Sequence, residues 1–124
     1  MLSTLATIFG IGGIFRLADA TYREIDEGAL GRFLEKDKTD LEQWVAEDFD
    51  CDDHEFRLHG AVHTDRYLAA MPIFITWVSW IQDGQRVGHA VMSYYNDGVV
   101  KIVEPQNDDI YSVPSKYRLD LLCG

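Results

Sequence analysis

The sequence predicts a single α+β domain, with helices in its first half and an antiparallel sheet in its second half. Its 124 residues fit one compact domain. Apolar residues recur at helical spacing before Pro72, whereas β-branched and aromatic residues dominate after it. Two Asp-Gly pairs, at 83–84 and 97–98, are typical two-residue hairpin turns. Helices followed by a meander of strands favour α+β architecture.

Two helices are expected between residues 21 and 47. The first covers residues 21–36, where apolar positions recur among charged neighbours. The second covers residues 40–47, because Thr39 can cap its start and Glu42 can complete a capping box.

A third helix has the clearest start signal. Asp50 is a good N-cap, and Asp52 and Asp53 fall in the first turn, where carboxylates favour the positive end of the helix dipole. This helix is expected to run through Val62, and another short one is expected within 64–70.

Three strands are expected at 73–81, 86–95 and 99–104. The first is almost continuously apolar, as in a strand buried on both faces. The opening segment 2–15 is also apolar, but it is too short to span a bilayer and no basic residue precedes it. We expect it to form a buried helix or an oligomer contact. The lack of a visible targeting signal favours a cytoplasmic protein.

The charge of the chain excludes several partners. The net charge is −10, which argues against binding nucleic acid or anionic membranes. Residues 35–55 hold ten carboxylates against two lysines. Such a block is either a solvated surface or a site for a hard cation such as calcium. The ten are Glu35, Asp37, Asp40, Glu42, Glu47, Asp48, Asp50, Asp52, Asp53 and Glu55.

Cys51 is the candidate nucleophile. It would occupy the first position of the third helix, where backbone N–H groups lower the pKa of a thiol. The alternative is a small buried apolar side chain. With Cys123 as the only other cysteine, no disulfide scaffold is expected.

The second hairpin predicts a partner pair for this thiol. A two-residue turn at 97–98 pairs Asn96 with Val99, which makes His89 and Glu104 diagonal neighbours on one face. A carboxylate that accepts from the imidazole Nδ1 fixes its tautomer and leaves Nε2 for a nucleophile.

These residues carry a resemblance to a known family. The strings Asp-Phe-Asp-Cys-Asp-Asp (48–53), Gly-His-Ala (88–90) and Glu-Pro-Gln (104–106) resemble the papain-like domain of the mushroom chimerolectins of the Marasmius oreades agglutinin type. The resemblance implies a papain-like fold, with the cysteine helix packed on the antiparallel sheet. It also implies a calcium-dependent cysteine protease with Cys51 as nucleophile, His89 as base and Glu104 as the residue that orients the base.

The resemblance extends to further positions. It implies Trp44 and Gln106 in the oxyanion region, and Gln43 is a third candidate there. His54 and Glu55 depart from the pattern, since an aromatic and a small residue are expected, and they alter either the pocket or the helix surface. Residues 1–30 carry no motif of the family. The family also implies a homodimer, and its sugar-binding β-trefoil does not fit in this length, so lectin activity is not expected.

The expected function is therefore calcium-dependent peptide hydrolysis on a protein or peptide substrate. Carboxylates beside Cys51 oppose thiolate formation, and a divalent cation would offset them. Asp52 and Asp53 are the first candidate ligands, followed by Asp50. One alternative is transglutaminase-like acyl transfer or amidase action. Another is a non-catalytic calcium-stabilised module for binding or dimerisation.

A rival metal site is visible on the third helix. Glu55, His59 and His63 recur at i, i+4 and i+8 and could present three zinc ligands, although the general-base glutamate of zinc proteases is missing. The alternative is an ordinary polar helix face. Trp77 and Trp80 are expected in the core or in a dimer interface.

Overall fold

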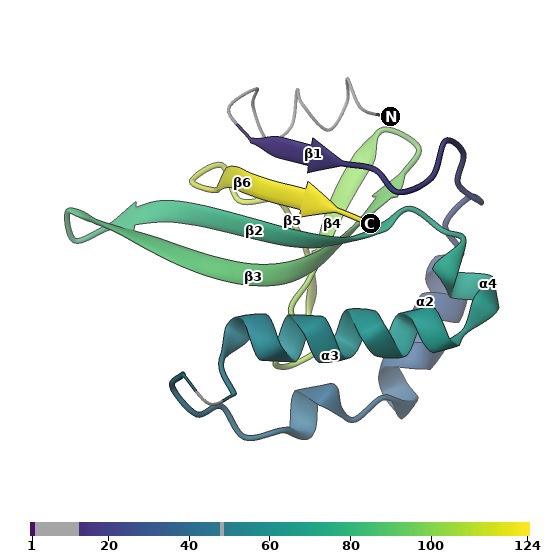
Figure 1. Ribbon diagram of the computed structural model, residues 1–124, viewed down its shortest axis with the longest axis horizontal. Coiled ribbons are helices and arrows are strands. Elements are labelled where there is room, and N and C mark those ends of the chain that lie inside the picture. The colour runs from purple at the N-terminus through teal and green to yellow at the C-terminus, as the bar shows by residue number, and fades with distance from the viewer. Residues whose placement is uncertain (2–12, 48) are drawn as a thin grey trace.

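A mixed sheet forms the centre of the molecule. The computed structural model describes Met1, residues 13–47 and residues 49–124. Within these residues, six strands form one sheet in the order β1-β6-β2-β3-β4-β5 (Figure 1). β1 runs parallel to β6, and the other neighbours are antiparallel. The strands are β1 (Ile14–Arg16), β2 (Ile73–Gln82), β3 (Gln85–Asn96), β4 (Val99–Val103), β5 (Ile110–Ser112) and β6 (Arg118–Cys123).

The helices of the described chain lie on one side of this sheet (Figure 1). The longest, α3, begins at the candidate nucleophile and runs along β2 and β3. The helical elements are α2 (Glu27–Lys36), the 3-10 turn η1 (Thr39–Leu41), α3 (Cys51–Thr64) and α4 (Arg66–Ala69). No helix among the described residues has the length and apolar character needed to cross a bilayer.

Both faces of the sheet are buried. On the helix side, Leu58 and Val62 of α3 pack into a cluster with Met92 of β3. On the other side, Phe74 and Leu122 belong to a second cluster, against which partly buried aromatic side chains pack. The expectation that β2 is covered on both faces is confirmed.

The expected fold class is wrong. The chain is mostly a six-stranded mixed sheet, more β-rich than a papain-like α+β fold with an antiparallel meander. The sequence pattern missed β1, β5 and β6. β1 and β5 have three residues each, too few to display a period of two. In β6, the alternation is broken because its pairing with β2 shifts register between Trp77 and Val78.

The two early helices also differ from expectation. The first begins only at Glu27, because Asp26 is its N-cap and its Oδ1 accepts from the Ala29 N–H at 2.9 Å. The helix expected over 40–47 is absent from the described residues, where only η1 forms. At the start of this turn the Thr39 N–H is hydrogen-bonded by Asp37 and not by a capping box, since the Asp37 Oδ2 accepts from it at 2.9 Å.

Other local expectations hold. α3 begins at Cys51 with Asp50 as its N-cap, and α4 lies within the predicted range. The expectation for segment 2–15, a buried helix or an oligomer contact, falls mostly outside the described residues, and its last two residues, Ile14 and Phe15, belong to strand β1.

The hairpin turns set the register of the candidate site. Asp97 and Gly98 have φ values of 46° and 85°, as a tight hairpin turn requires. Asn96 pairs with Val99, so the predicted register is confirmed. The β3–β4 ladder ends at the pair Met92 and Val103.

We predict that Leu58→Ala destabilises the protein by about 2–5 kcal/mol, because the Leu58 side chain is 0% exposed and anchors α3 to the sheet. Urea unfolding followed by circular dichroism measures the change. Ile81→Ala is the control, since Ile81 is 58% exposed and its loss should change stability by no more than about 0.5 kcal/mol. Equal unfolding midpoints for the two variants would contradict this account of the core.

Candidate functional site

Cys51 lies at the start of α3, partly buried, beside the middle of β3. Hydrogen bonding to the His89 side chain lowers the pKa of the Cys51 thiol. Burial opposes this effect, and the charge of Asp50 also raises the pKa, whereas the backbone N–H of Ala90 lowers it. The net shift is downward, which favours the thiolate.

His89 and Glu104 are in direct contact. The His89 Nε2 lies 2.5 Å from the Glu104 Oε2, and both side chains are largely buried. The predicted ring orientation is reversed, because Nε2 and not Nδ1 faces the carboxylate, which leaves Nδ1 for Cys51. The Gln106 backbone N–H donates to the other carboxylate oxygen, Oε1, at 3.3 Å. Glu104 is thereby held from two sides.

The charge state of His89 follows from these contacts. Burial lowers its pKa, but hydrogen bonds to Cys51 and Glu104 outweigh burial and raise the pKa to about 9. At neutral pH the imidazole is therefore protonated beside a thiol whose pKa is lowered. The arrangement favours a thiolate–imidazolium pair, which can attack an electrophile and then donate a proton.

Trp80 is a neighbour of this pair that sequence reasoning placed only in the core or an interface. Its ring meets His89 edge to face at a centroid distance of 6.2 Å and stacks on Tyr117 at 5.2 Å. It also packs against the second core cluster, so the core assignment is confirmed in part. Trp77 instead meets Phe56 of α3 at 5.5 Å.

Of the three oxyanion candidates, only Gln106 hydrogen-bonds to Cys51, His89 or Glu104 in the described structure, and it does so through its backbone N–H, which donates to Glu104. Trp44 is half-exposed and Gln43 is exposed, in the segment between η1 and α3. Within the described ranges, neither these side chains nor that of Gln106 has a hydrogen bond to Cys51, His89 or Glu104. Their oxyanion roles stay predictions.

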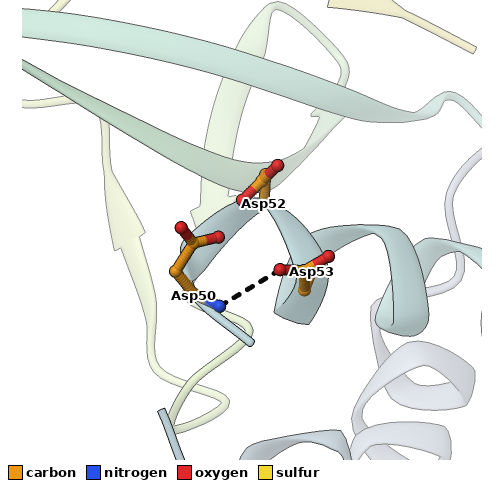
Figure 2. Close-up of side chains that lie close together, drawn as sticks. All are labelled: Asp50, Asp52 and Asp53. Carbon is orange, nitrogen blue, oxygen red and sulfur yellow. Dashed lines mark hydrogen bonds between the residues drawn. The ribbon is translucent and has the colours of Figure 1, made fainter. Parts of the chain in front are cut away.

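The carboxylates expected to bind calcium do come together. Oxygen atoms of Asp50, Asp52 and Asp53 lie within 4.8 Å of one another at the start of α3 (Figure 2). The Asp53 Oδ2 accepts from the Asp50 N–H at 3.2 Å, and the Asp50 Oδ1 is buried with no partner in the described structure. Three carboxylates and an unsatisfied oxygen fit the oxygen ligands that calcium prefers.

A further carboxylate, Asp108, was not found from the sequence. Its φ is 63°, and its Oδ1 is buried without a partner among the described residues. Burial, together with the charges of Asp40 and Asp37, raises the Asp108 pKa to about 7. No sequence signal marks the proximity of Asp108 to Asp37 and Asp40, because it arises only when the fold brings the β4–β5 loop to the segment after α2.

The two departures from the family pattern, His54 and Glu55, are buried, which excludes the helix-surface alternative of the two that the sequence left open. His54 places its ring nitrogens 2.9 Å from the Asp50 carbonyl oxygen and 3.0 Å from that of Glu42. Glu55 is fully buried, and burial followed by the charge of Glu104 raises its pKa. The polar-face alternative for Glu55 and His59 is also wrong, because both are buried.

Solved structures show that this fold occurs in a mushroom lectin. A PSL1a–E64 complex aligns with a TM-score of 0.80 and 18% identity, over 99% of this chain and 47% of that one. Polyporus squamosus lectin bound to the human-type influenza-binding epitope Neu5Aca2-6Galb1-4GlcNAc aligns with a TM-score of 0.74 and 16% identity, over 98% and 48%. The chain thus spans about half the length of each. No family model and no curated protein matches the sequence.

These similarities establish the fold alone. The resemblance to mushroom lectins is confirmed at that level. The more specific resemblance to the calcium-dependent protease domain stays a prediction.

We predict that iodoacetamide alkylates Cys51 at pH 6 faster than Cys123. Hydrogen bonding to His89 lowers the pKa of Cys51, whereas burial and then the charge of Glu55 raise that of Cys123. Peptide mass spectrometry over a pH series measures both rates, and Cys51→Ala isolates the Cys123 signal.

Glu104→Gln should move the Cys51 alkylation profile to higher pH, because it removes a partner that raises the pKa of His89. Equal rates at the two cysteines at pH 6, or an unmoved profile in Glu104→Gln, would refute the activated thiolate.

Proposed function

We propose that this chain is a calcium-dependent cysteine endopeptidase that acts through Cys51, His89 and Glu104. The observation that carries the proposal is the contact series at the start of α3. The His89 imidazole is 2.5 Å from Glu104 and hydrogen-bonds the Cys51 thiol, whose pKa is lowered. A nucleophile, a base and a residue that orients the base are the parts that acyl transfer by a thiol requires.

The proposed reaction has two stages. The Cys51 thiolate attacks the carbonyl carbon of a peptide bond, and the C–N bond breaks as His89 gives its proton to the leaving amine. Water then adds to the resulting thioester. His89 takes a proton from that water, and the C–S bond breaks to release the acid and restore the thiolate–imidazolium pair. Glu104 holds the imidazole orientation throughout.

Calcium would be held by Asp50, Asp52 and Asp53, which fit it by their oxygen atoms and their spacing. A bound cation supplies positive charge beside the nucleophile. The charge of Asp50 raises the pKa of Cys51, so neutralising that carboxylate would favour the thiolate. The Asp50 N–H donates to the Asp53 carboxylate at the start of α3. A cation that fixes these carboxylates would therefore also fix the helix start that carries Cys51.

One structural neighbour, PSL1a, is in a complex with E64. Transfer of the acyl group to an amine, or action on a non-protein amide, uses the same three residues. Identification of the products separates these reactions from proteolysis.

The second candidate is a non-catalytic, calcium-stabilised binding module. Both neighbours are forms of a lectin, and one holds a sialylated glycan, which favours this alternative over the peptidase. Its partner would then be a carbohydrate and not a peptide. A homodimer is compatible with either candidate.

We predict hydrolysis of fluorescently labelled casein in calcium and its loss in chelator. Cys51→Ala should abolish hydrolysis, and Glu104→Gln should reduce it by roughly 10²–10⁴-fold, because the base loses its orientation and charge partner. Asp52→Asn should raise the calcium concentration needed. Cys123→Ala is the matched control and should keep full activity, since its thiol lies outside the triad. Full activity in Cys51→Ala would sink the peptidase proposal.

We further predict that Neu5Aca2-6Galb1-4GlcNAc shows no saturable binding to the calcium-loaded chain in calorimetry. The contacts at the start of α3 support a reactive thiol, and the sugar epitope is bound by a neighbour about twice as long. Saturable binding that survives Cys51→Ala, together with slow alkylation of Cys51, would instead establish the binding module.

A further inference from the structure

The last turns of α3 bring two imidazoles together. The His59 Nε2 and the His63 Nε2 lie 3.0 Å apart, on residues four positions apart in the helix. The ring centroids are 4.5 Å apart, farther than the nitrogens, so the two Nε2 corners lead toward each other. His63 is exposed and His59 is buried, so the pair connects the interior with the surface.

This separation fits two ligands of one metal ion. With bonds of about 2.0–2.1 Å, an ion bonded to both nitrogens would hold them about 2.9 Å apart at a right angle and about 3.3 Å apart at the tetrahedral angle. The observed 3.0 Å falls between these values. The nitrogens therefore need little movement to share an ion.

Glu55 lies next to His59, and both of its carboxyl oxygens lack a hydrogen-bond partner among the described residues. Its carboxylate is 0% exposed. The Glu55 Oε1 is 4.0 Å from the His59 Nδ1, which is itself buried with no partner in that part of the chain. The unpartnered Glu55 carboxyl group thus lies near the unpartnered Nδ1 of His59, whose other ring nitrogen, Nε2, faces His63. Leaving buried polar atoms unsatisfied is costly, so their arrangement calls for a role.

We propose that His59 and His63 bind a divalent transition-metal ion of the zinc class through their Nε2 atoms, and that the Glu55 carboxyl group closes its 4.0 Å gap to accept from the His59 Nδ1 when the ion is bound. Metal-bound histidines usually donate their other ring N–H to a carboxylate, which fixes the tautomer. Imidazole nitrogens favour zinc and its neighbours over calcium. Glu55 is an outer partner here and not the third ligand suggested by the i, i+4, i+8 spacing.

The state of His59 suits this role. With its proton on Nδ1, a neutral imidazole offers the Nε2 lone pair to a metal ion. The exposed side of the pair leaves coordination positions open to water. His63 is twelve residues beyond Cys51, about 18 Å along the helix, so the proposed site is separate from the thiol.

Calorimetry with zinc chloride tests the proposal on the full chain. The Cys51→Ala background and excess calcium keep the thiol and the aspartates from taking zinc, so the result does not depend on the proposed peptidase. We expect one zinc per chain. Glu55→Gln should weaken binding by about 10–100-fold, and His63→Ala should weaken it at least as much. Thr64→Ala, an exposed neighbour on the same turn, is the matched control and should bind like the parent.

Nitrogen NMR of the imidazoles provides a second readout, with expected zinc-dependent shifts at the Nε2 of His59 and of His63. His63 is exposed, so His63→Ala should fold, which circular dichroism checks. The proposal is overturned if the parent takes up no zinc in excess calcium. Zinc affinity unchanged in His63→Ala overturns it as well, as does binding that leaves both Nε2 signals in place.

Discussion

The packing of α3 against the sheet is the interaction on which the candidate site depends. Leu58 and Val62 fix the helix on β2 and β3 through the helix-side core. Because the helix begins at Cys51, the same packing decides where the thiol meets His89. A slip of one helical turn would move the sulfur by about 5.4 Å and end the contact. The core of this domain is thus also the positioning device of its candidate chemistry, which makes buried apolar residues far from the sulfur relevant to reactivity.

A second constraint acts against the first. The segment that delivers the thiol also concentrates negative charge, and the charge of Asp50 opposes the thiolate that His89 favours. The same tension recurs at Asp108, where burial and two nearby aspartates raise the pKa of the carboxyl to about 7. At neutral pH, the Asp108 carboxyl group therefore either keeps its proton or ionises beside the charges of Asp40 and Asp37. A cation near these carboxylates would relieve both tensions, which gives the acidic segment a physical role beyond solubility.

The parts of the site that the sequence predicted follow local rules. The Asp50 cap fixed the helix start, and the two-residue turn at 97–98 fixed a register that brings His89 to Glu104. The missed parts depend on distant segments. β6 lies between β1 and β2, both distant from it in the sequence, and its register shift against β2 breaks the alternation that would mark a strand, so the predicted fold class is wrong. Asp108 and Trp80 lie near their partners only because the fold brings together segments that are distant in the sequence. The burial of Glu55 contradicts the usual preference of glutamate for solvent.

Glu55 lies in α3 between two groups of side chains that suit different metal ions. The first turn of α3 presents carboxylate oxygens, which suit a hard cation, and its later turns present imidazole nitrogens, which suit a borderline one. Glu55 lies between them, close enough to Glu104 for the charges to interact and 4.0 Å from His59. An ionised Glu55 would disfavour negative charge near Glu104, whereas a bound ion at His59 and His63 would favour ionisation of Glu55. Glu55 thus lies where an ion bound at His59 and His63 would be expected to act on Glu104 through charge alone, without movement of the helix.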